Sequence, residues 1–190
     1  MSDTIRTFIA VEIPGNILSK IRELQEGIKG YGFKISWVRP ENIHLTLKFL
    51  GNIEAVDVEK ISNAISNTAK GYTPISLAAK GIGVFPDIRR PRVLWVGLTG
   101  QIETLVNLQK TLDENLKAFG FPEEKRSFKG HLTLGRIKTK INPKKLGDAL
   151  MACRSFESET FTAGEVILYK SELKPSGAVY SKLASASLGQ

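Results

Sequence analysis

Stretches of alternating hydrophobic and polar residues take turns along this chain with stretches in which hydrophobic residues recur every three or four positions. Residues 6–13 and 92–98 have the alternation and the β-branched and aromatic content of strands. After each of them, aliphatic residues at helical spacing predict a helix, which ends at Gly30 in the first case and at Gly120 in the second. The periodic positions are Ile17, Ile21, Leu24 and Ile28 in the first helix, and Leu105, Leu108, Leu112, Leu116 and Phe119 in the second.

The order of predicted strands and helices is also the same after these two helices, so the sequence divides into two similar halves. Each half next has a strand, a second helix and a third strand-like run, and a last strand at 178–186 has no counterpart. This order predicts an α+β fold of two similar lobes related by an approximate two-fold axis. Helices and strands alternate in many proteins, so coincidence is the competing explanation. The second helices are marked by Val58, Ile61 and Ile65 and by Leu146, Leu150 and Cys153; the third strands are 75–85 and 161–172; the approximate repeats are 6–85 and 92–172 of a single domain spanning 1–190.

Both histidines of the chain open the same tetrapeptide, once in each half. Given the first copy, ordinary residue usage would produce the second by chance in about one case in a thousand or fewer. Side chains alternate faces along a strand, so His and Thr share one face of each motif and the two leucines share the other. Two such strands side by side would place two imidazoles around one small ligand, with two hydroxyls beside them. For either copy alone, a hydrogen-bonded structural histidine on a half-buried strand is the alternative. The motifs are His44-Leu45-Thr46-Leu47 and His131-Leu132-Thr133-Leu134.

Two imidazoles and two hydroxyls in one place suit acid–base chemistry at phosphorus. Because an unperturbed histidine has a pKa of about 6.5, one ring can be neutral at neutral pH while its neighbour is protonated. The neutral ring can take a proton from water while the cationic ring gives one to a leaving oxygen. Threonine hydroxyls can donate hydrogen bonds to the non-bridging oxygens. No metal is required when the ester is strained, so a 2′,3′-cyclic phosphate fits this chemistry best.

Arg136 is a further candidate, five residues after the second histidine. In a regular strand this odd spacing places Arg136 on the opposite face from His131, and only a bulge or bend would change that. A guanidinium on the histidine face would brace a phosphate. On the opposite face, Arg136 would be a surface ion-pair partner.

Composition and charge narrow the class of partner. The chain of 190 residues carries 27 basic and 19 acidic residues, a net charge of +8, with a pI near 9.6. This excess favours polyanionic partners, nucleic acid first. Cys153 is the only cysteine, so no internal disulfide forms, and two histidines with one cysteine do not make the usual structural zinc set. The N-terminus lacks a signal-peptide profile and no apolar run reaches the length of a membrane span, so we expect a cytoplasmic protein without membrane contact.

With these motifs in place, the chain resembles the 2H phosphoesterase superfamily, and more closely the bacterial and archaeal RNA 2′,3′-cyclic phosphodiesterases, also called the 2′-5′ RNA ligase family. One difference is Gly130, where many relatives have a proline before the second histidine, and glycine there allows a different entry into the strand. The resemblance is carried by the two motifs with their flanks, Trp37-Val38-Arg39-Pro40-Glu41-Asn42-Ile43 before the first, Lys48-Phe49-Leu50-Gly51 after it and Gly135-Arg136 after the second, and by Arg6-Thr7-Phe8-Ile9-Ala10, Arg92-Val93-Leu94-Trp95-Val96-Gly97 and Leu168-Tyr169-Lys170-Ser171.

The resemblance implies a bilobal α+β fold in which two antiparallel sheets flank a central cleft that holds the histidines, with helices on the outside. It implies hydrolysis of a terminal RNA 2′,3′-cyclic phosphate to a 2′-phosphate, without a cofactor or metal. By the same resemblance His44 is the proton donor and His131 the proton acceptor, and Arg136 joins Thr46 and Thr133 as a substrate-binding residue. We expect a monomer whose partner is an RNA end, with tRNA fragments as one candidate source.

Three other functions stay open at this point. The first is 2′-5′ RNA ligation, a near reversal of hydrolysis, although the sequence has no P-loop or nucleotide-activating lysine motif for an ATP-driven reaction. The second is cleavage of a cyclic phosphodiester in a small nucleotide. The third, from a different class, is a non-catalytic RNA-binding module that uses the basic surface, and it predicts that both histidines are dispensable.

Overall fold

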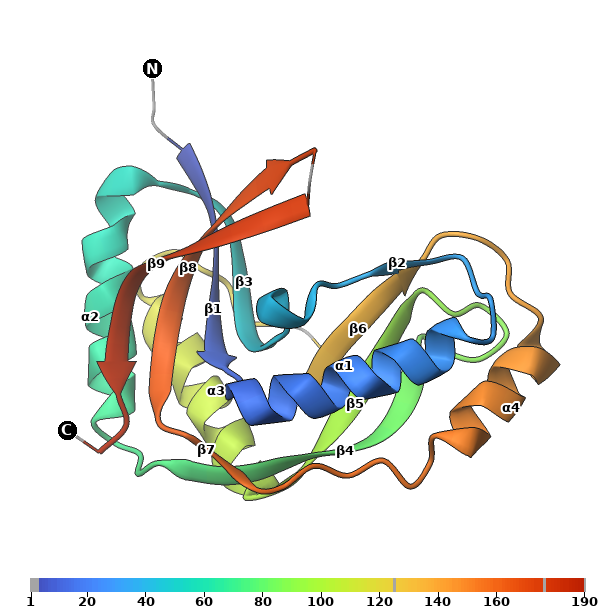
Figure 1. Cartoon of the computed structure of the whole chain (residues 1–190). Coiled ribbons are helices and arrows are strands. Elements are labelled where there is room, and N and C mark those ends of the chain that lie inside the picture. The colour runs from blue at the N-terminus through green and yellow to red at the C-terminus, as the bar shows by residue number, and fades with distance from the viewer. Residues whose placement is uncertain (1–3, 125, 176, 190) are drawn as a thin grey trace.

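The computed structural model describes residues 4–124, 126–175 and 177–189. Strands and helices alternate along the described chain as the sequence pattern predicts (Figure 1). The helices are α1 (Gly15–Lys29), α2 (Val58–Ala69), α3 (Ile102–Lys117) and α4 (Pro143–Ala152), with short 3₁₀ turns at Pro40–Asn42 and Ala55–Asp57. The strands are β1 (Thr4–Glu12), β2 (Ile35–Trp37), β3 (His44–Glu54), β4 (Ile75–Phe85), β5 (Val93–Gly100), β6 (His131–Ile137), β7 (Phe161–Ala163), β8 (Glu165–Lys174) and β9 (Gly177–Ser187).

The described strands pair into one continuous antiparallel sheet, which consists of two halves. The strand order is β7-β4-β5-β6-β3-β1-β8-β9, and β2 lies off this path and pairs with β6. The two halves join at β3 and β6, which run antiparallel with Leu45 opposite Leu132. An approximate two-fold relation about this pair exchanges β3 with β6, β1 with β5 and β8 with β4. The predicted α+β class with a duplicated, two-fold arrangement of antiparallel strands is confirmed.

Each half of the sheet contains a strand that comes from the other repeat of the sequence. β4 comes from the first repeat, yet it pairs with β5 of the second. β8 comes from the second repeat and pairs with β1 of the first. The repeats in the sequence are therefore not the same units as the halves of the sheet. Neither repeat can complete its own sheet from its own residues.

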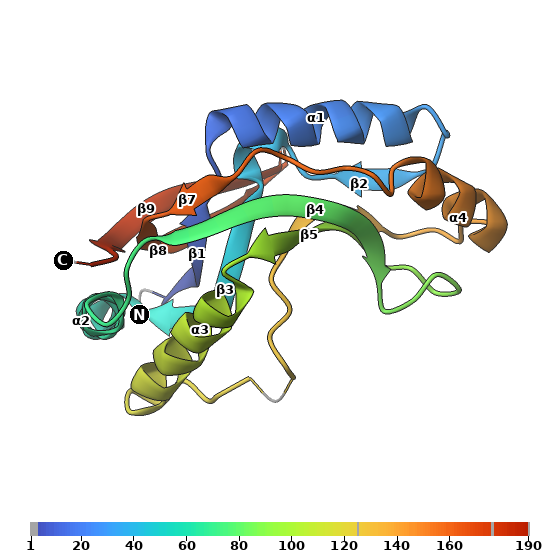
Figure 2. The same ribbon diagram turned by 90° about the horizontal axis from the view of Figure 1, so that it is seen from below.

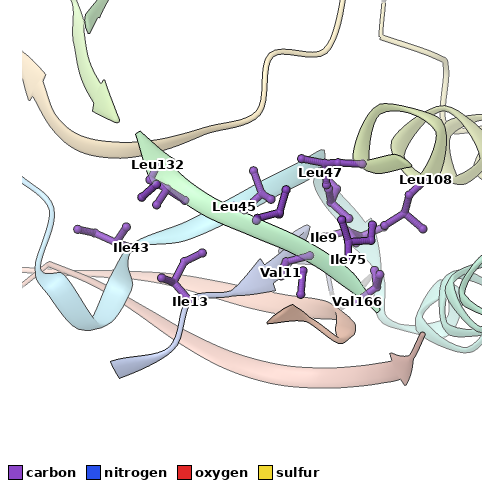
Figure 3. Packing of buried hydrophobic residues seen from close by; sticks show 14 of the residues in the cluster. Ile9, Val11, Ile13, Ile43, Leu45, Leu47, Ile75, Leu108, Leu132 and Val166 are labelled. Carbon is purple, nitrogen blue, oxygen red and sulfur yellow. The ribbon is translucent and has the colours of Figure 1, made fainter. Parts of the chain in front are cut away.

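The helices lie around the outside of the strands (Figure 2), and α1, α2 and α3 share one hydrophobic core with them. The aliphatic stripes predicted for α1 and α3 are buried, and both leucines of each motif join them in one hydrophobic core. Figure 3 shows Leu45, Leu47 and Leu132 pointing into the same cluster as Leu108 of α3. Among the described residues, a second and smaller cluster lies on the opposite side of β1 and β8, made of Phe8, Ala10, Ile167, Tyr169 and Tyr180.

A few local expectations differ from the structure. Phe119 lies beyond the end of α3 and is 44% exposed, because the chain turns at Gly120 before the ring can reach the core. Cys153 caps α4, packs against the core while half-buried, and has a thiol pKa that burial raises. The strand expected at 161–172 is two strands, β7 and β8. In the described part of the chain, no helix is long and apolar enough to span a membrane.

A buried ion pair fixes β3 to the segment that leads into the second motif. Lys48 directly follows the first motif, is buried, and pairs with the buried Asp113 of α3. The same ammonium donates to the carbonyl of Pro122 at 2.8 Å, and Asp113 accepts from the backbone N–H of Glu124 at 3.1 Å. Strand β3, helix α3 and the start of the 118–130 connection are thus held by one pair of charges.

We predict that Lys48→Met destabilises the fold by about 3–5 kcal/mol, because it leaves the Asp113 carboxylate buried without its cation. The measurement is the free energy of unfolding by urea titration. Lys60→Met is the matched control, since Lys60 forms an exposed ion pair with Asp57 and such pairs contribute about 0–1 kcal/mol. Equal losses in the two variants would contradict a special role for the buried pair.

Candidate active site

The motif faces that lack helices line a cavity of about 810 Å³ to which both halves of the sheet contribute. His44 and Thr46 reach it from β3, and Thr133 and Arg136 reach it from β6. Strand β1, the segment around β2 and the β8–β9 hairpin provide the remaining walls. The other lining residues used below are Arg6, Phe8, Arg39, Asn42, Phe49, Asn52 and Tyr180.

The pairing of β3 with β6 determines how the two motifs face each other. Leu45 and Leu132 are opposite and buried, while the histidine and threonine of each motif are half-buried on the other side of the strands. In an antiparallel pair, the residues next to an opposed pair are opposed in turn. This register therefore sets each histidine beside the threonine of the other motif. The expected alternation of faces within both motifs is confirmed.

His44 is held in one orientation and one tautomer. Its Nδ1 lies 2.8 Å from the carbonyl oxygen of Asn42, and because a carbonyl only accepts, Nδ1 carries the proton and Nε2 is left as the reactive nitrogen. The ring stacks on Phe8 at 4.6 Å between centroids and meets the edge of Tyr180 at 5.3 Å. Burial lowers the pKa of His44, and the hydrogen bond to Asn42 offsets this only in part.

His131 repeats this arrangement in a more open setting. Its Nδ1 lies 2.7 Å from the carbonyl oxygen of Lys129, again two residues earlier, so the same tautomer is selected. The ring meets Phe85 edge-on at 5.0 Å. Although Thr133 lines the cavity, His131 itself is not among the lining residues and lies beside the cavity. The two histidines thus differ in exposure while their hydrogen bonds match.

Arg136 lies on the cavity side, so the expectation for a regular strand is wrong. Relative to β5, strand β6 has one extra residue, Leu134, between Thr133 and Gly135. This β-bulge shifts the alternation by one position and turns Arg136 to the side of Thr133. The Leu134 carbonyl oxygen accepts hydrogen bonds from the side-chain amide of buried Gln25 at 3.0 Å and from the backbone N–H of Val38 at 2.9 Å.

The first motif has the same bulge. Relative to β1, strand β3 has the extra residue Leu47, between Thr46 and Lys48. Phe49 therefore occupies the same position relative to His44 as Arg136 does relative to His131. Phe49 also lines the cavity. Two buried polar residues near the bulges also correspond: Asp113 pairs with the ammonium group of Lys48, and Gln25 donates to the carbonyl oxygen of Leu134. Each follows a buried leucine of the core helix, Leu112 in α3 and Leu24 in α1.

Sequence reasoning did not single out Arg6 and Tyr180 as site residues. Tyr180 is brought against His44 by the β8–β9 hairpin. Burial raises the pKa of the Tyr180 phenol, and the nearby charges of Arg136 and Arg6 oppose this rise. Both guanidinium groups therefore act on one hydroxyl from within the cavity. Nothing in the local pattern marks either residue, since each is one polar position in an alternating strand.

The cavity is strongly suited to anions. Its lining includes Arg6, Arg39 and Arg136, together with His44, and no aspartate or glutamate among the described residues. Over the described ranges, no group of three or more His, Cys, Asp or Glu side chains gathers to hold a metal ion. The arrangement supplies positive charge, hydroxyl donors and imidazoles, the groups that bind a phosphate and move its protons.

Gly130 leaves the histidine hydrogen bond of the second motif in place. A Cβ at this position would lie 3.2 Å from the Leu105 side chain and 3.3 Å from that of Leu98. Glycine therefore allows these two leucines to pack closely under the start of β6.

Comparison of the sequence with known proteins gives matches over almost the whole chain. The model of the LigT-like phosphoesterase family matches twice, over residues 11–95 and 96–180. The chain is 40% identical to the RNA 2′,3′-cyclic phosphodiesterase of Methanocaldococcus jannaschii, covering 93% of this chain and 96% of that protein. It is 34% identical to the protein of the same name from Methanothermobacter thermautotrophicus, covering 94% and 96%.

Solved structures agree with this relationship. The crystal structure of TT0787 from Thermus thermophilus superposes with a TM-score of 0.79 at 26% identity, covering 97% of this chain and 98% of that one. Escherichia coli LigT, in a complex with 3′-AMP, superposes with a TM-score of 0.76 at 22% identity over 99% and 100% of the two chains, which supports the fold. The duplicated family match, the relatives over almost the full length and the shared fold show that this chain belongs to the LigT-like phosphoesterase family.

Proposed function

We propose that this phosphoesterase hydrolyses 2′,3′-cyclic phosphate ends of RNA to 2′-phosphomonoesters, with His44 as general acid and His131 as general base. The observation that carries the proposal is that the same hydrogen bond orients both histidines. In both motifs a backbone carbonyl two residues earlier holds Nδ1 and leaves Nε2 for proton transfer. The choice of RNA is supported by the names of the curated relatives over nearly the whole chain.

The difference in exposure supports this assignment of roles. His131 lies at the open side, where water is available, so its Nε2 takes a proton as the water oxygen attacks phosphorus. The bond from phosphorus to O3′ breaks on the opposite side, and His44, which is protonated on both nitrogens as the imidazolium, gives its Nε2 proton to O3′. The phosphate then remains on O2′. The mechanism is metal-independent, because ring strain activates the ester and the two imidazoles supply both proton transfers.

The remaining polar groups hold the phosphate. Thr46 and Thr133 line the cavity beside the histidines and can donate hydrogen bonds to the non-bridging oxygens. Arg136, turned inward by the bulge, neutralises part of their charge. The bound anion also favours the protonated form of His44, against the effect of burial, so substrate binding prepares the acid.

The alternatives make different predictions. Ligation to a 2′-5′ bond would use the same groups in reverse, with a ribose hydroxyl in place of water, and a small cyclic nucleotide would use the same phosphate site. A non-catalytic RNA-binding module would need neither histidine. Incubation of a short RNA cyclic phosphate with EDTA, followed by resolution of the 2′- and 3′-phosphate products, separates these cases. Action on tRNA fragments, a monomeric state and a cytoplasmic location stay predictions.

We predict that His44→Ala and His131→Ala each lower kcat by about 10²–10⁴, the usual contribution of a general acid or base. Both rings lie outside the main hydrophobic core, so the fold should survive. The measurement is turnover of a dinucleotide cyclic phosphate, with circular dichroism as the folding control. Near-normal turnover in either folded variant would refute the two-histidine mechanism.

Thr46→Val and Thr133→Val should each cost about 1.5–3 kcal/mol in transition-state stabilisation, because the shape is kept while a donor to a charged group is lost. The measurement is kcat/KM across pH. The pH optimum should stay in place, since threonine does not titrate. A marked change in the pH profile would argue instead that the hydroxyl takes part in proton transfer.

The His44 imidazole can be followed directly by titration, because the chain has only one other histidine. We predict that His44 titrates below its ordinary value of about 6.5 in the free protein, since burial disfavours the cation. Inorganic phosphate should raise this midpoint, because the anion stabilises the imidazolium. The measurement is NMR of the ring protons, with His131→Ala to assign the signals. A midpoint at or above 6.5 without phosphate would contradict the effect of burial.

A further inference from the structure

Resting on the proposed function, we propose that the half of the cavity next to His44 is a subsite for the whole terminal nucleotide. In this subsite the nucleobase stacks on Phe49, and Arg6 binds the phosphodiester on the 5′ side of the terminal ribose. The site is therefore built for the end of an oligonucleotide and prefers it to a free nucleoside 2′,3′-cyclic phosphate.

The direction of the reaction places the nucleoside. The leaving oxygen, O3′, belongs to the terminal ribose, so the group that protonates O3′ must lie beside that ribose. His44 is this group, and the residues around it come from β1, β3 and the β8–β9 hairpin. The attacking water comes from the opposite side, where His131 is open. The ribose and its base consequently extend over the β1–β3 side of the cavity.

Phe49 offers a surface for the base on that side. It is a large hydrophobic residue that lines the cavity and is nevertheless 60% exposed. The bulge at Leu47 turns it to the cavity face, and it lies opposite Phe8 across the strand pair, with ring centroids 6.1 Å apart and an angle of 47° between the planes. Phe8 in turn stacks on His44. An exposed ring, held in place beside the proton donor, is the kind of platform on which a nucleobase stacks.

Arg6 supplies a positive charge for a second phosphate. It is exposed, lines the cavity, and lies two residues before Phe8 on the same face of β1, opposite Asn52. Among the described residues, no carboxylate lies within ion-pair distance of Arg6 or Arg136. Arg136 comes from β6 beside Thr133 and therefore serves the scissile phosphate. Arg6 lies on the nucleoside side of the cavity and is therefore the residue that binds the next phosphate of the RNA chain.

The decisive experiment compares two substrates that differ in the 5′ phosphodiester. One is a nucleoside 2′,3′-cyclic phosphate, and the other is a dinucleotide ending in the same cyclic phosphate. We expect the unaltered protein to prefer the dinucleotide in kcat/KM, and Arg6→Gln to reduce this preference about tenfold, the usual effect of losing a hydrogen bond to a charged group. Arg22→Gln is the matched control, because Arg22 is an exposed arginine on α1 that does not line the cavity.

A dinucleotide with a neutral methylphosphonate at the internal position gives a second test of the charge. It should lose the preference with the unaltered protein and respond little to Arg6→Gln. Equal losses for the mononucleotide and the dinucleotide in Arg6→Gln would overturn the assignment, because Arg6 would then act on the cyclic phosphate itself. No loss for either substrate would overturn it as well.

The base contact is tested with Phe49→Leu, which keeps an apolar side chain and removes the ring. We expect KM to rise about tenfold for both substrates that carry a base, and to change little for a dinucleotide whose terminal base is absent. Phe119→Leu is the control, since this exposed phenylalanine lies beyond α3 and does not line the cavity. A Phe49→Leu effect of the same size on the abasic substrate would overturn the stacking assignment.

Binding of the products separates this proposal from the proposed function. The affinities for a nucleoside 2′-phosphate and for a dinucleotide 2′-phosphate are measured by calorimetry, with no turnover required. If the protein binds the dinucleotide more tightly through Arg6 but hydrolyses neither cyclic phosphate, the reaction is wrong and the subsite is supported. If it hydrolyses both and Arg6→Gln leaves the ratio of the affinities unchanged, the subsite is wrong and the reaction stands.

Discussion

The antiparallel contact between β3 and β6 is the constraint on which the rest of the structure depends. At the Leu45–Leu132 pair the two halves of the sheet meet, the two leucines close the core, and the opposite sides of the strands become the floor of the cavity. Because the strands are related by a two-fold operation at this point, a residue type that appears once per repeat appears once on each of the two strands. The proposed acid and base on opposite sides of phosphorus rest on this geometry.

The two β-bulges are duplicated, but the residues that they turn toward the cavity differ. Both bulges turn the fifth residue after a histidine to the cavity face, and this residue is Phe49 in one motif and Arg136 in the other. The buried polar residues near the bulges differ too, because Asp113 pairs with a lysine ammonium group and Gln25 donates to a backbone carbonyl oxygen. The backbone geometry is thus duplicated while the side chains have diverged. One end of the cavity is aromatic and the other carries the guanidinium of Arg136.

Local patterns in the sequence predict the parts of the structure that depend on neighbouring residues. The helical stripes, the faces of the two motifs and the duplicated order of elements follow from periodicity, and the structure confirms them. Two features depend on pairing between distant strands and leave no local signal. The bulge at Leu134 overturns the expected direction of Arg136, and the β8–β9 hairpin brings Tyr180 to His44 from 136 positions away in the sequence. The short strand β2 is likewise defined by its pairing with β6.

The exchange of β4 and β8 between the halves bears on how such a chain arises from two copies of one unit. A single copy on its own would expose the edge of its motif strand, leave its third strand without a partner and hold only one histidine. Unpaired edges of this kind promote association with another chain. Two separate copies would restore every pairing only by intertwining, as a dimer in which each subunit gives a strand to the other. Joining the copies into one polypeptide makes that mutual dependence intramolecular, so half a site never has to be stable alone.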